Sequence, residues 1–217
     1  MDYSKLQNGS DIRGVALEGI EGQHVNLTES ACKDIGRGFA LWLKETTGKN
    51  TLKVAVGRDS RLSGPTLSAW LCEAMVEAGL DVTDFGMAST PAMFMATVTE
   101  GYSFDGTVMI TASHLPFNRN GFKFFTCKGG LEKEDIKKIL AYAGSDATTG
   151  LTKGSLTEGA FMDTYAKLLA DKIRSATGEE KPLEGFRIVV DAGNGAGGFY
   201  ADKVLKPLGA NTDGSRY

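Results

Sequence analysis

The sequence predicts an α/β protein, because short segments with the pattern of strands alternate with longer segments with the pattern of helices. The strand-like segments are rich in Val, Ile and Phe, whereas the helical segments space their apolar residues three or four positions apart. Glycines and polar residues follow the strand-like segments, which is typical of the loop-rich edge where α/β proteins place their functional groups.

The elements can be assigned along the chain from these patterns. Strands are expected over residues 52–56, 79–86, 107–110 and 122–126, and helices over 28–48, 66–78 and 132–143, with a further helix beginning near Pro91. Thr28 is a candidate N-cap, and Pro91 suits the first turn of a helix. The helices therefore alternate with strands as far as residue 143.

A composition rich in Gly, Ser and Thr makes residues 144–156 the best candidate for a linker. We therefore expect a first domain over residues 1–150 and the beginning of a second over 151–217. In the second part, a helix is expected from 158 to 175. A strand from Arg187 to Val190 should then lead into the glycine-rich segment 191–198.

Composition and charge exclude several classes of protein. The 217 residues are 41% hydrophobic and 24% charged, and the net charge is −3, which argues against general electrostatic binding to nucleic acid. No apolar run is long enough to span a membrane, and no secretory signal is visible. We expect a cytoplasmic protein, or one in an organelle stroma after removal of a targeting segment.

The three cysteines, Cys32, Cys72 and Cys127, lie far apart and lack the spacing of a zinc site or a disulfide framework. Cys32 and Cys72 fall in expected helices and should pack as small apolar residues. This cysteine usage fits a reducing compartment.

The segment from Thr111 to Lys123 concentrates reactive groups between two expected strands. Ser113 could act as a nucleophile or as a phosphate carrier. His114 and Lys123 could move protons or neutralise the charge of a phosphate. On composition alone, a polar hairpin whose side chains face water fits the segment equally well.

Two earlier segments carry arginines next to glycines. Arg13 ends a short strand-like segment and could grip a phosphate or pair with Asp11. Arg58 and Arg61 follow an expected strand and precede a helix, the place where α/β sheets tend to bind ligands. Alternatively, Asp59 and Arg61 only brace that helix.

The glycines at 193, 195 and 198 have the spacing Gly-x-Gly-x-x-Gly after an expected strand. This spacing is a weak signal for dinucleotide binding. The acidic residue that such a site needs about 20 positions later could only be Asp213, which lies in a loop-like tail.

Four motifs taken together resemble the α-D-phosphohexomutases, which include phosphoglucomutases and phosphomannomutases. They are Asp11–Gly14, Gly57–Arg61, Thr111–Lys123 with its Thr-Ala-Ser-His-x-Pro and Asn-Gly-x-Lys, and Asp191–Gly197. Leu115 stands where the family usually has Asn, which affects a local contact of the loop. The resemblance implies a three-layer α/β/α domain with a mixed sheet, followed by the start of a similar second domain.

The resemblance also implies a mechanism. Ser113 would carry a phosphoryl group and move it between the 1- and 6-positions of a hexose phosphate through a hexose bisphosphate intermediate. Arg13, Lys123 and His114 would be the other catalytic groups. Arg58, Arg61 and Asn120 would contact the substrate.

The resemblance implies Mg²⁺ on the phosphate of Ser113. The family's Asp-Gly-Asp-x-Asp-Arg metal segment is absent from this sequence, so the expected second domain is truncated before the metal loop. We therefore expect little or no mutase activity from these 217 residues alone, with the missing domains supplied by a longer parent or a separate chain.

Three other functions remain compatible with the sequence. The chain could be a phosphatase or phosphosugar-binding module, a catalytically silent interaction fragment, or an NAD-dependent oxidoreductase that uses the glycines at 193–198. Glucose, mannose and glucosamine phosphates all remain candidate substrates.

Overall fold

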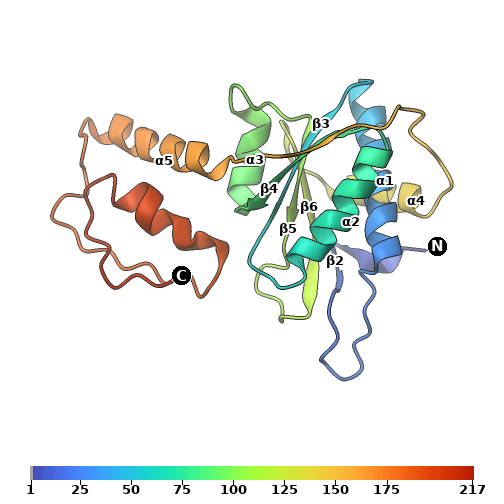
Figure 1. Ribbon diagram of the computed structural model, residues 1–217, viewed down its shortest axis with the longest axis horizontal. Coiled ribbons are helices and arrows are strands. Elements are labelled where there is room, and N and C mark those ends of the chain that lie inside the picture. Colours follow the sequence, from blue (N-terminus) through green and yellow to red (C-terminus); the bar gives the residue numbers. More distant parts are fainter. Residues whose placement is uncertain (1) are drawn as a thin grey trace.

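A mixed eight-stranded sheet organises the computed structural model, which describes residues 2–217 (Figure 1). Its strands are β1 (Gln7–Asn8), β2 (Asp11–Val15), β3 (Lys53–Arg58), β4 (Asp81–Met87), β5 (Gly106–Ile110), β6 (Arg119–Thr126), β7 (Gly129–Gly130) and β8 (Leu156–Glu158). The order is β1-β2-β6-β5-β3-β4-β8, with β7 paired to β6. The strands β5, β3, β4 and β8 are parallel, while β6 runs antiparallel to β5 and β2.

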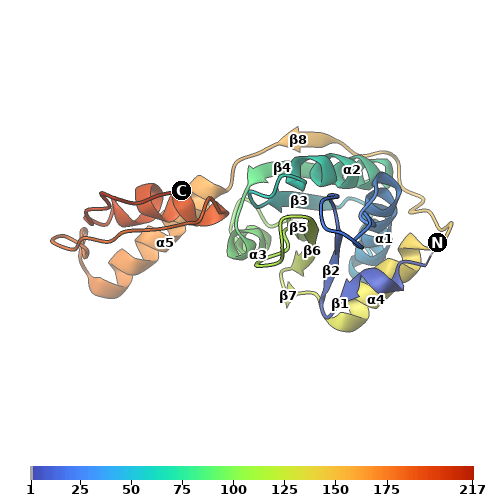
Figure 2. The same cartoon turned by 90° about the horizontal axis from the view of Figure 1, so that it is seen from below.

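Helices cover both faces of this sheet (Figure 2). They are α1 (Glu29–Thr47), α2 (Gly64–Glu77), α3 (Thr90–Val98) and α4 (Lys133–Ala143), while α5 (Met162–Thr177) extends beyond the sheet. The helices α1, α2 and α4 share one hydrophobic cluster with the sheet, whereas α3 packs in a second cluster. This arrangement confirms the predicted three-layer α/β/α fold with a mixed sheet.

Alternation along the strands assigns each side chain to one of these two layers. Val54 and Val56 of β3 pack in the cluster with α1 and α2, whereas Ala55 between them packs in the cluster with α3. On β6, Phe124 is buried against Phe39 of α1, with ring centroids 4.7 Å apart. Lys123, which lies between Phe122 and Phe124 on β6, therefore faces the α3 side.

The helix boundaries agree with the expected capping residues. The Thr28 side chain accepts a hydrogen bond from the Ala31 amide at 3.3 Å, so Thr28 is the N-cap of α1. Gly48 ends the same helix with φ of 66°, a left-handed conformation that glycine adopts without steric cost. Pro91 lies in the first turn of α3, as expected.

Two expected boundaries are wrong. The β6 strand begins at Arg119 rather than at 122, because the backbone of residues 119–122 already pairs with β2. Residues 156–158 form β8 on the outer edge of β4, where their backbone groups find partners, so the next helix begins at Met162 rather than at 158.

The expected strand over 187–190 is also wrong. Isolated bridges join Arg187 to Asn211 and Asp191 to Arg216, without a continuous ladder. The neighbouring side chains Phe186 and Val189 are 58% and 55% exposed, so this segment has no covered apolar face to stabilise a strand. The glycines that follow are therefore not framed by a strand and a long helix, as a dinucleotide site requires.

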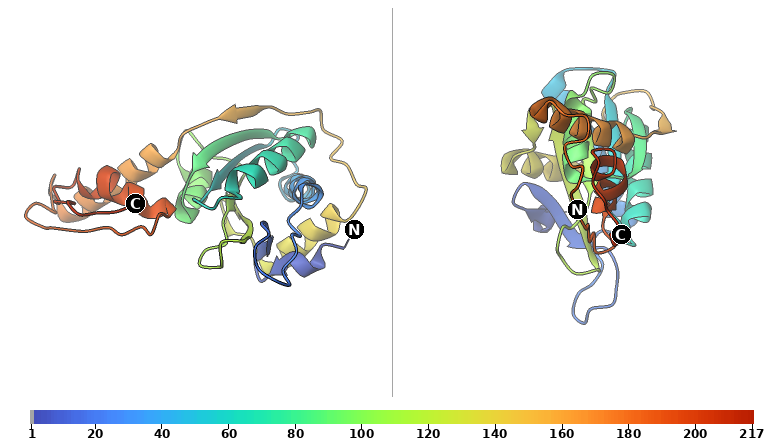
Figure 3. Two further views of the ribbon diagram at one scale, coloured as in Figure 1. Left: turned by 60° about the horizontal axis from the view of Figure 1, so that its bottom comes forward. Right: turned by 90° about the vertical axis from the view of Figure 1, so that its left-hand side faces the viewer.

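The last part of the chain extends to one side of the sheet rather than covering it (Figure 3). Phe161, just before α5, packs against Phe85 of β4 with ring centroids 5.7 Å apart. Further along α5, Ala166 and Ala170 pack with Val204 and Leu208 in a small separate cluster. The C-terminal segment is thus anchored to the main body chiefly near the start of α5.

The cysteines offer a direct test of this packing. Burial raises the pKa of both the Cys32 and the Cys72 thiol to about 12, whereas Cys127 is exposed. At pH 8 we expect only Cys127 to react rapidly with a thiol reagent, as mass spectrometry would show, because the buried thiols stay neutral and covered. Cys127→Ser should remove the fast reaction. Rapid modification of Cys32 or Cys72 in the folded protein would contradict the packing.

Candidate functional site

Ser113 lies on an exposed loop that follows β5. Its backbone has φ of 54°, a left-handed conformation that is unusual for a residue other than glycine. The Ser113 amide donates to Thr111 Oγ1 at 2.9 Å, and the Thr111 hydroxyl donates to Asp59 Oδ2 at 2.6 Å. Within residues 2–217 the Ser113 hydroxyl itself has no hydrogen-bond partner, so it is free to react.

The side chain of Arg61 holds this loop from the neighbouring β3–α2 connection. Its Nη1 donates to the carbonyls of Pro116 at 2.9 Å and Arg119 at 3.1 Å, and its Nη2 donates to those of Ser113 at 2.7 Å and Leu115 at 2.8 Å. The Arg61 Nε lies 3.4 Å from Asp59 Oδ2. Arg61 thus ties the two ends of the loop to each other.

A second charged group lies on the α3 side of β2 and β6. Asp11 accepts hydrogen bonds from Lys123 Nζ at 2.7 Å and from Arg13 Nη2 at 2.8 Å. The Arg13 guanidinium also donates to the carbonyl of Thr111, two residues before Ser113. Two cations share one carboxylate, so the group retains a formal positive charge that suits a phosphate.

Gly121 explains how Arg13 reaches the serine loop. Arg13 and Gly121 are directly opposite in the β2–β6 ladder. A Cβ at Gly121 would lie 2.8 Å from Arg13 Cδ and 2.0 Å from the Ile12 carbonyl oxygen. The missing side chain therefore lets the Arg13 side chain cross β6 toward Thr111.

Three expected site residues lie apart from this group. Asn120 is fully buried on the opposite side of β6 and donates to Ser63 Oγ at 2.8 Å. Arg58 pairs with Asp84 at 3.1 Å and lines a cavity of about 290 Å³ near β8. His114 is exposed, and within residues 2–217 it makes no hydrogen bond or ion pair.

The sequence did not predict the full roles of Asp11 and Asp59, or any role for the Thr111 hydroxyl. Asp11 and Asp59 were expected only to pair with or brace their neighbours, yet Asp11 joins both cations and Asp59 supports Thr111. The Asp-x-Arg spacing was a usable signal for Asp11, because residues two apart on a strand face the same side. Thr111 opens the Thr-Ala-Ser-His motif, but the sequence assigns its hydroxyl no role of its own.

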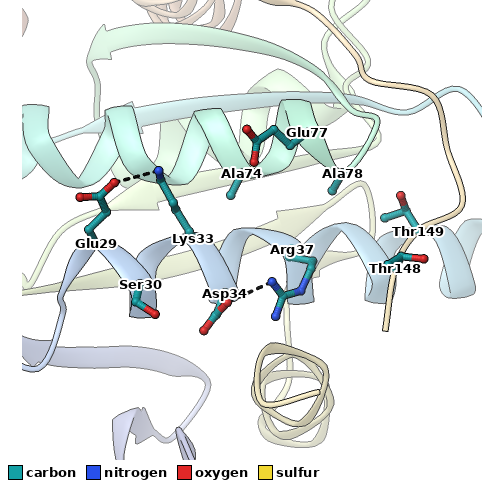
Figure 4. Close-up of a pocket in the computed structure, with 10 residues that line it drawn as sticks. All are labelled: Glu29, Ser30, Lys33, Asp34, Arg37, Ala74, Glu77, Ala78, Thr148 and Thr149. Carbon is teal, nitrogen blue, oxygen red and sulfur yellow. Dashed lines mark ion pairs between the residues drawn. The ribbon is translucent and has the colours of Figure 1, made fainter. Parts of the chain in front are cut away.

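A cavity of about 690 Å³ between α1 and α2 includes no residue of the serine loop (Figure 4). Ion pairs join Lys33 to Glu29 at 2.8 Å and Arg37 to Asp34 at 3.0 Å along its wall. Both cations of its wall are thus already paired with carboxylates, and Glu77 adds a further negative charge, so the cavity does not suit a phosphate.

The residues that the structure describes do not form a complete metal site. Among residues 2–217 no three His, Cys, Asp or Glu side chains are grouped in a way that could hold a metal ion. The acid in the group beside the loop, Asp11, is already paired with Arg13 and Lys123. These residues do not fit Mg²⁺ without further ligands from outside this chain.

The fold and the loop together define an α/β/α domain that presents an exposed serine on a loop contacted by Arg13. Residues 4–149 match the family model described as phosphoglucomutase/phosphomannomutase, alpha/beta/alpha domain I. The chain therefore belongs to the phosphoglucomutase/phosphomannomutase family and corresponds to its N-terminal portion.

Individual relatives agree with this assignment. The chain is 36% identical to a phosphoglucomutase of Neisseria gonorrhoeae over 195 residues, which are 89% of this chain and 39% of the relative. It is 31% identical to a phosphoglucosamine mutase of Caldicellulosiruptor saccharolyticus, over 95% of this chain and 44% of the relative. The chain thus spans less than half the length of these relatives.

A solved structure shares the fold. The crystal structure of a phosphoglucomutase/phosphomannomutase family protein from Burkholderia thailandensis superposes with a TM-score of 0.77 and 28% identity. The match covers 98% of this chain and 44% of that one. In the described part of the chain, no helix is both long and apolar enough to cross a membrane.

Proposed function

We propose that Ser113 is the phosphoryl carrier of a phosphohexomutase and that the protein acts in its complete form on hexose phosphates. The observation that carries this proposal is the exposed, unbonded Ser113 hydroxyl on a loop tied to Arg13 through Thr111. The names of the relatives, which include phosphoglucomutase and phosphoglucosamine mutase, support a sugar phosphate as the substrate.

In the proposed reaction, Ser113 carries one phosphoryl group at the start and again at the end. A hydroxyl of the hexose phosphate attacks the phosphorus of phospho-Ser113, the new P–O bond to the sugar forms, and the bond to Ser113 Oγ breaks. The resulting bisphosphate turns over and returns its other phosphoryl group to Ser113. The product is the isomer with the phosphate at the other end of the sugar.

The residues near the loop have separate roles in this proposal. Lys123 and Arg13 stabilise the negative charge of the moving phosphoryl group, which is the main demand of such a transfer. His114, exposed and adjacent to Ser113, accepts the proton of the attacking hydroxyl. Of the three expected substrate contacts, Arg58 is the best candidate, because Asn120 is buried and the Nη atoms of Arg61 already donate to carbonyls of the loop.

A hexose bisphosphate is the proposed activator, because it can place the first phosphoryl group on Ser113. Mg²⁺ is the proposed metal, and when bound it would neutralise phosphate charge. The Ser113 phosphate would supply one ligand, and the carboxylate ligands would come from outside this chain.

We expect the 217-residue chain alone not to interconvert glucose 1-phosphate and glucose 6-phosphate. Because residues 2–217 form no complete metal site, the rate should be at least about 10³-fold below that of a longer protein that continues as the relatives do. Phosphorus NMR of both proteins with glucose 1-phosphate, glucose 1,6-bisphosphate and Mg²⁺ would measure this. Comparable rates would refute the need for further domains. Release of inorganic phosphate would instead indicate a phosphatase.

A further inference from the structure

We propose that Arg61 is a positioning residue that fixes the conformation of Ser113, rather than a residue that binds substrate. The inference rests on the proposed function, in which Ser113 carries the phosphoryl group. It concerns the geometry of the loop, which can be measured without any transfer reaction.

The guanidinium of Arg61 has no accessible hydrogen left for a phosphate, because its Nη hydrogens are engaged and its Nε–H, which makes no hydrogen bond, is buried. A guanidinium carries five N–H groups, four of them on the two Nη atoms. Those Nη atoms already donate to the carbonyls of Ser113, Leu115, Pro116 and Arg119. The remaining Nε faces Asp59 at 3.4 Å, and the Arg61 side chain is only 13% exposed. A substrate phosphate could engage Arg61 only by displacing the loop.

The hydrogen bonds of Arg61 hold Ser113, the residue of the loop with a left-handed backbone. Ser113 has φ of 54°, a left-handed conformation that is unfavourable for residues other than glycine. Its carbonyl accepts from Arg61, and its amide donates to Thr111 Oγ1, so the peptide groups on both sides of Ser113 are held. Asp59 joins the two anchors, because it pairs with Arg61 and accepts from the Thr111 hydroxyl.

The contacts also close the loop against its far end. Arg61 Nη1 binds the carbonyl of Arg119, the first residue of β6, while Nη2 binds that of Ser113 near the end of β5. One side chain therefore bridges the two ends of the loop beyond the β5–β6 ladder, whose pairing continues to the bond from the Thr111 amide to the Gly121 carbonyl. Without it, the described bonds that remain to residues 113–116 are short-range, from the Ser113 amide to Thr111 Oγ1, from the Leu115 amide to the Ala112 carbonyl and from the Arg119 amide to the Pro116 carbonyl, while Asn118 stays held by the amides of Ala16 and Leu17.

The test replaces Arg61 and a matched arginine in the full 217-residue chain. Arg37 is the matched residue, because it also pairs with an acid, Asp34, and donates to the loop carbonyls of Ala143 and Ser145. Hydrogen exchange should speed up at least about 10-fold at the amides of Ser113 and Leu115 in Arg61→Ala. These amides should exchange as in the wild type in Arg37→Ala.

Chemical rescue separates positioning from a general loss of structure. Millimolar methylguanidinium should restore slow exchange at Ser113 in Arg61→Ala, because it refills the same donor site. It should leave the wild type and Arg37→Ala unchanged. Unchanged exchange in Arg61→Ala, or faster exchange that methylguanidinium does not reverse, would overturn the proposal.

Phosphoryl loading from glucose 1,6-bisphosphate gives the second readout. Arg61→Ala should slow the loading of Ser113 at saturating bisphosphate, with recovery in methylguanidinium. A change only in the bisphosphate concentration needed for half-maximal loading would instead show that Arg61 binds substrate. If the wild type never loads Ser113, the proposed function fails, whereas the exchange data still decide the role of Arg61.

Discussion

Ser113→Ala is expected to abolish phosphoryl transfer. The serine hydroxyl is the group proposed to form the covalent phosphoryl intermediate, and alanine removes it without adding bulk. The nearby Thr111 hydroxyl cannot replace it, because Thr111 is buried and its hydroxyl donates to Asp59 at 2.6 Å. In a longer protein with isomerase activity, we expect the rate to fall by at least about 10⁴-fold.

Ser103 provides a matched control for this substitution. It is also an exposed serine with a left-handed backbone, at φ of 42°, but it lies in the turn after α3. Ser103→Ala should leave the isomerisation rate within about 2-fold of the wild type, because surface substitutions far from a site rarely matter. An active Ser113→Ala variant would rule out Ser113 as the carrier.

Lys123→Met is expected to slow the loading of Ser113 by about 10²- to 10³-fold, the usual effect of removing one charge-stabilising group. The substitution keeps most of the apolar stem but removes the ammonium that lies 2.7 Å from Asp11. Asp11 then keeps only Arg13 as a partner, and the group loses its formal positive charge. A phosphate would therefore be stabilised less well beside the loop.

Mass spectrometry of quenched samples would measure the loading rate. Two further variants serve as controls. Lys128→Met removes an exposed lysine from the turn after β6 and should have no effect. Adding Asp11→Asn to Lys123→Met removes the carboxylate that offsets Arg13, so the group regains a formal positive charge and part of the rate should recover if charge is the cause. A wild-type rate in Lys123→Met would show that Lys123 has no part in transfer.

The sequence predicts the layers of the fold because alternation and helical spacing directly reflect burial. Phe122 and Phe124 face α1, and Lys123 faces the other side, as the pattern of that segment implies. The same reasoning failed for residues 156–158, where three residues of linker-like composition pair with β4. Their pairing depends on the free edge of β4, which has no local signature.

The sequence motifs predict which segments form the candidate site, but they do not predict how the side chains are oriented or which groups they bind. The motifs predict that Ser113 and Arg13 belong to one site, and the segments that carry them do meet. Asn120 could not be placed, because its orientation depends on a strand that starts three residues earlier than the pattern suggests. The role of Arg61 was hidden for another reason: its partners are backbone carbonyls, which every residue carries.

The most direct test is the intact mass of the 217-residue chain before and after incubation with glucose 1,6-bisphosphate and Mg²⁺. The account predicts a gain of about 80 Da, the mass of one phosphoryl group, located by peptide mapping at Ser113 and absent from Ser113→Ala. A gain at another residue, or an equal gain in Ser113→Ala, would contradict the assignment of Ser113 as the phosphoryl carrier.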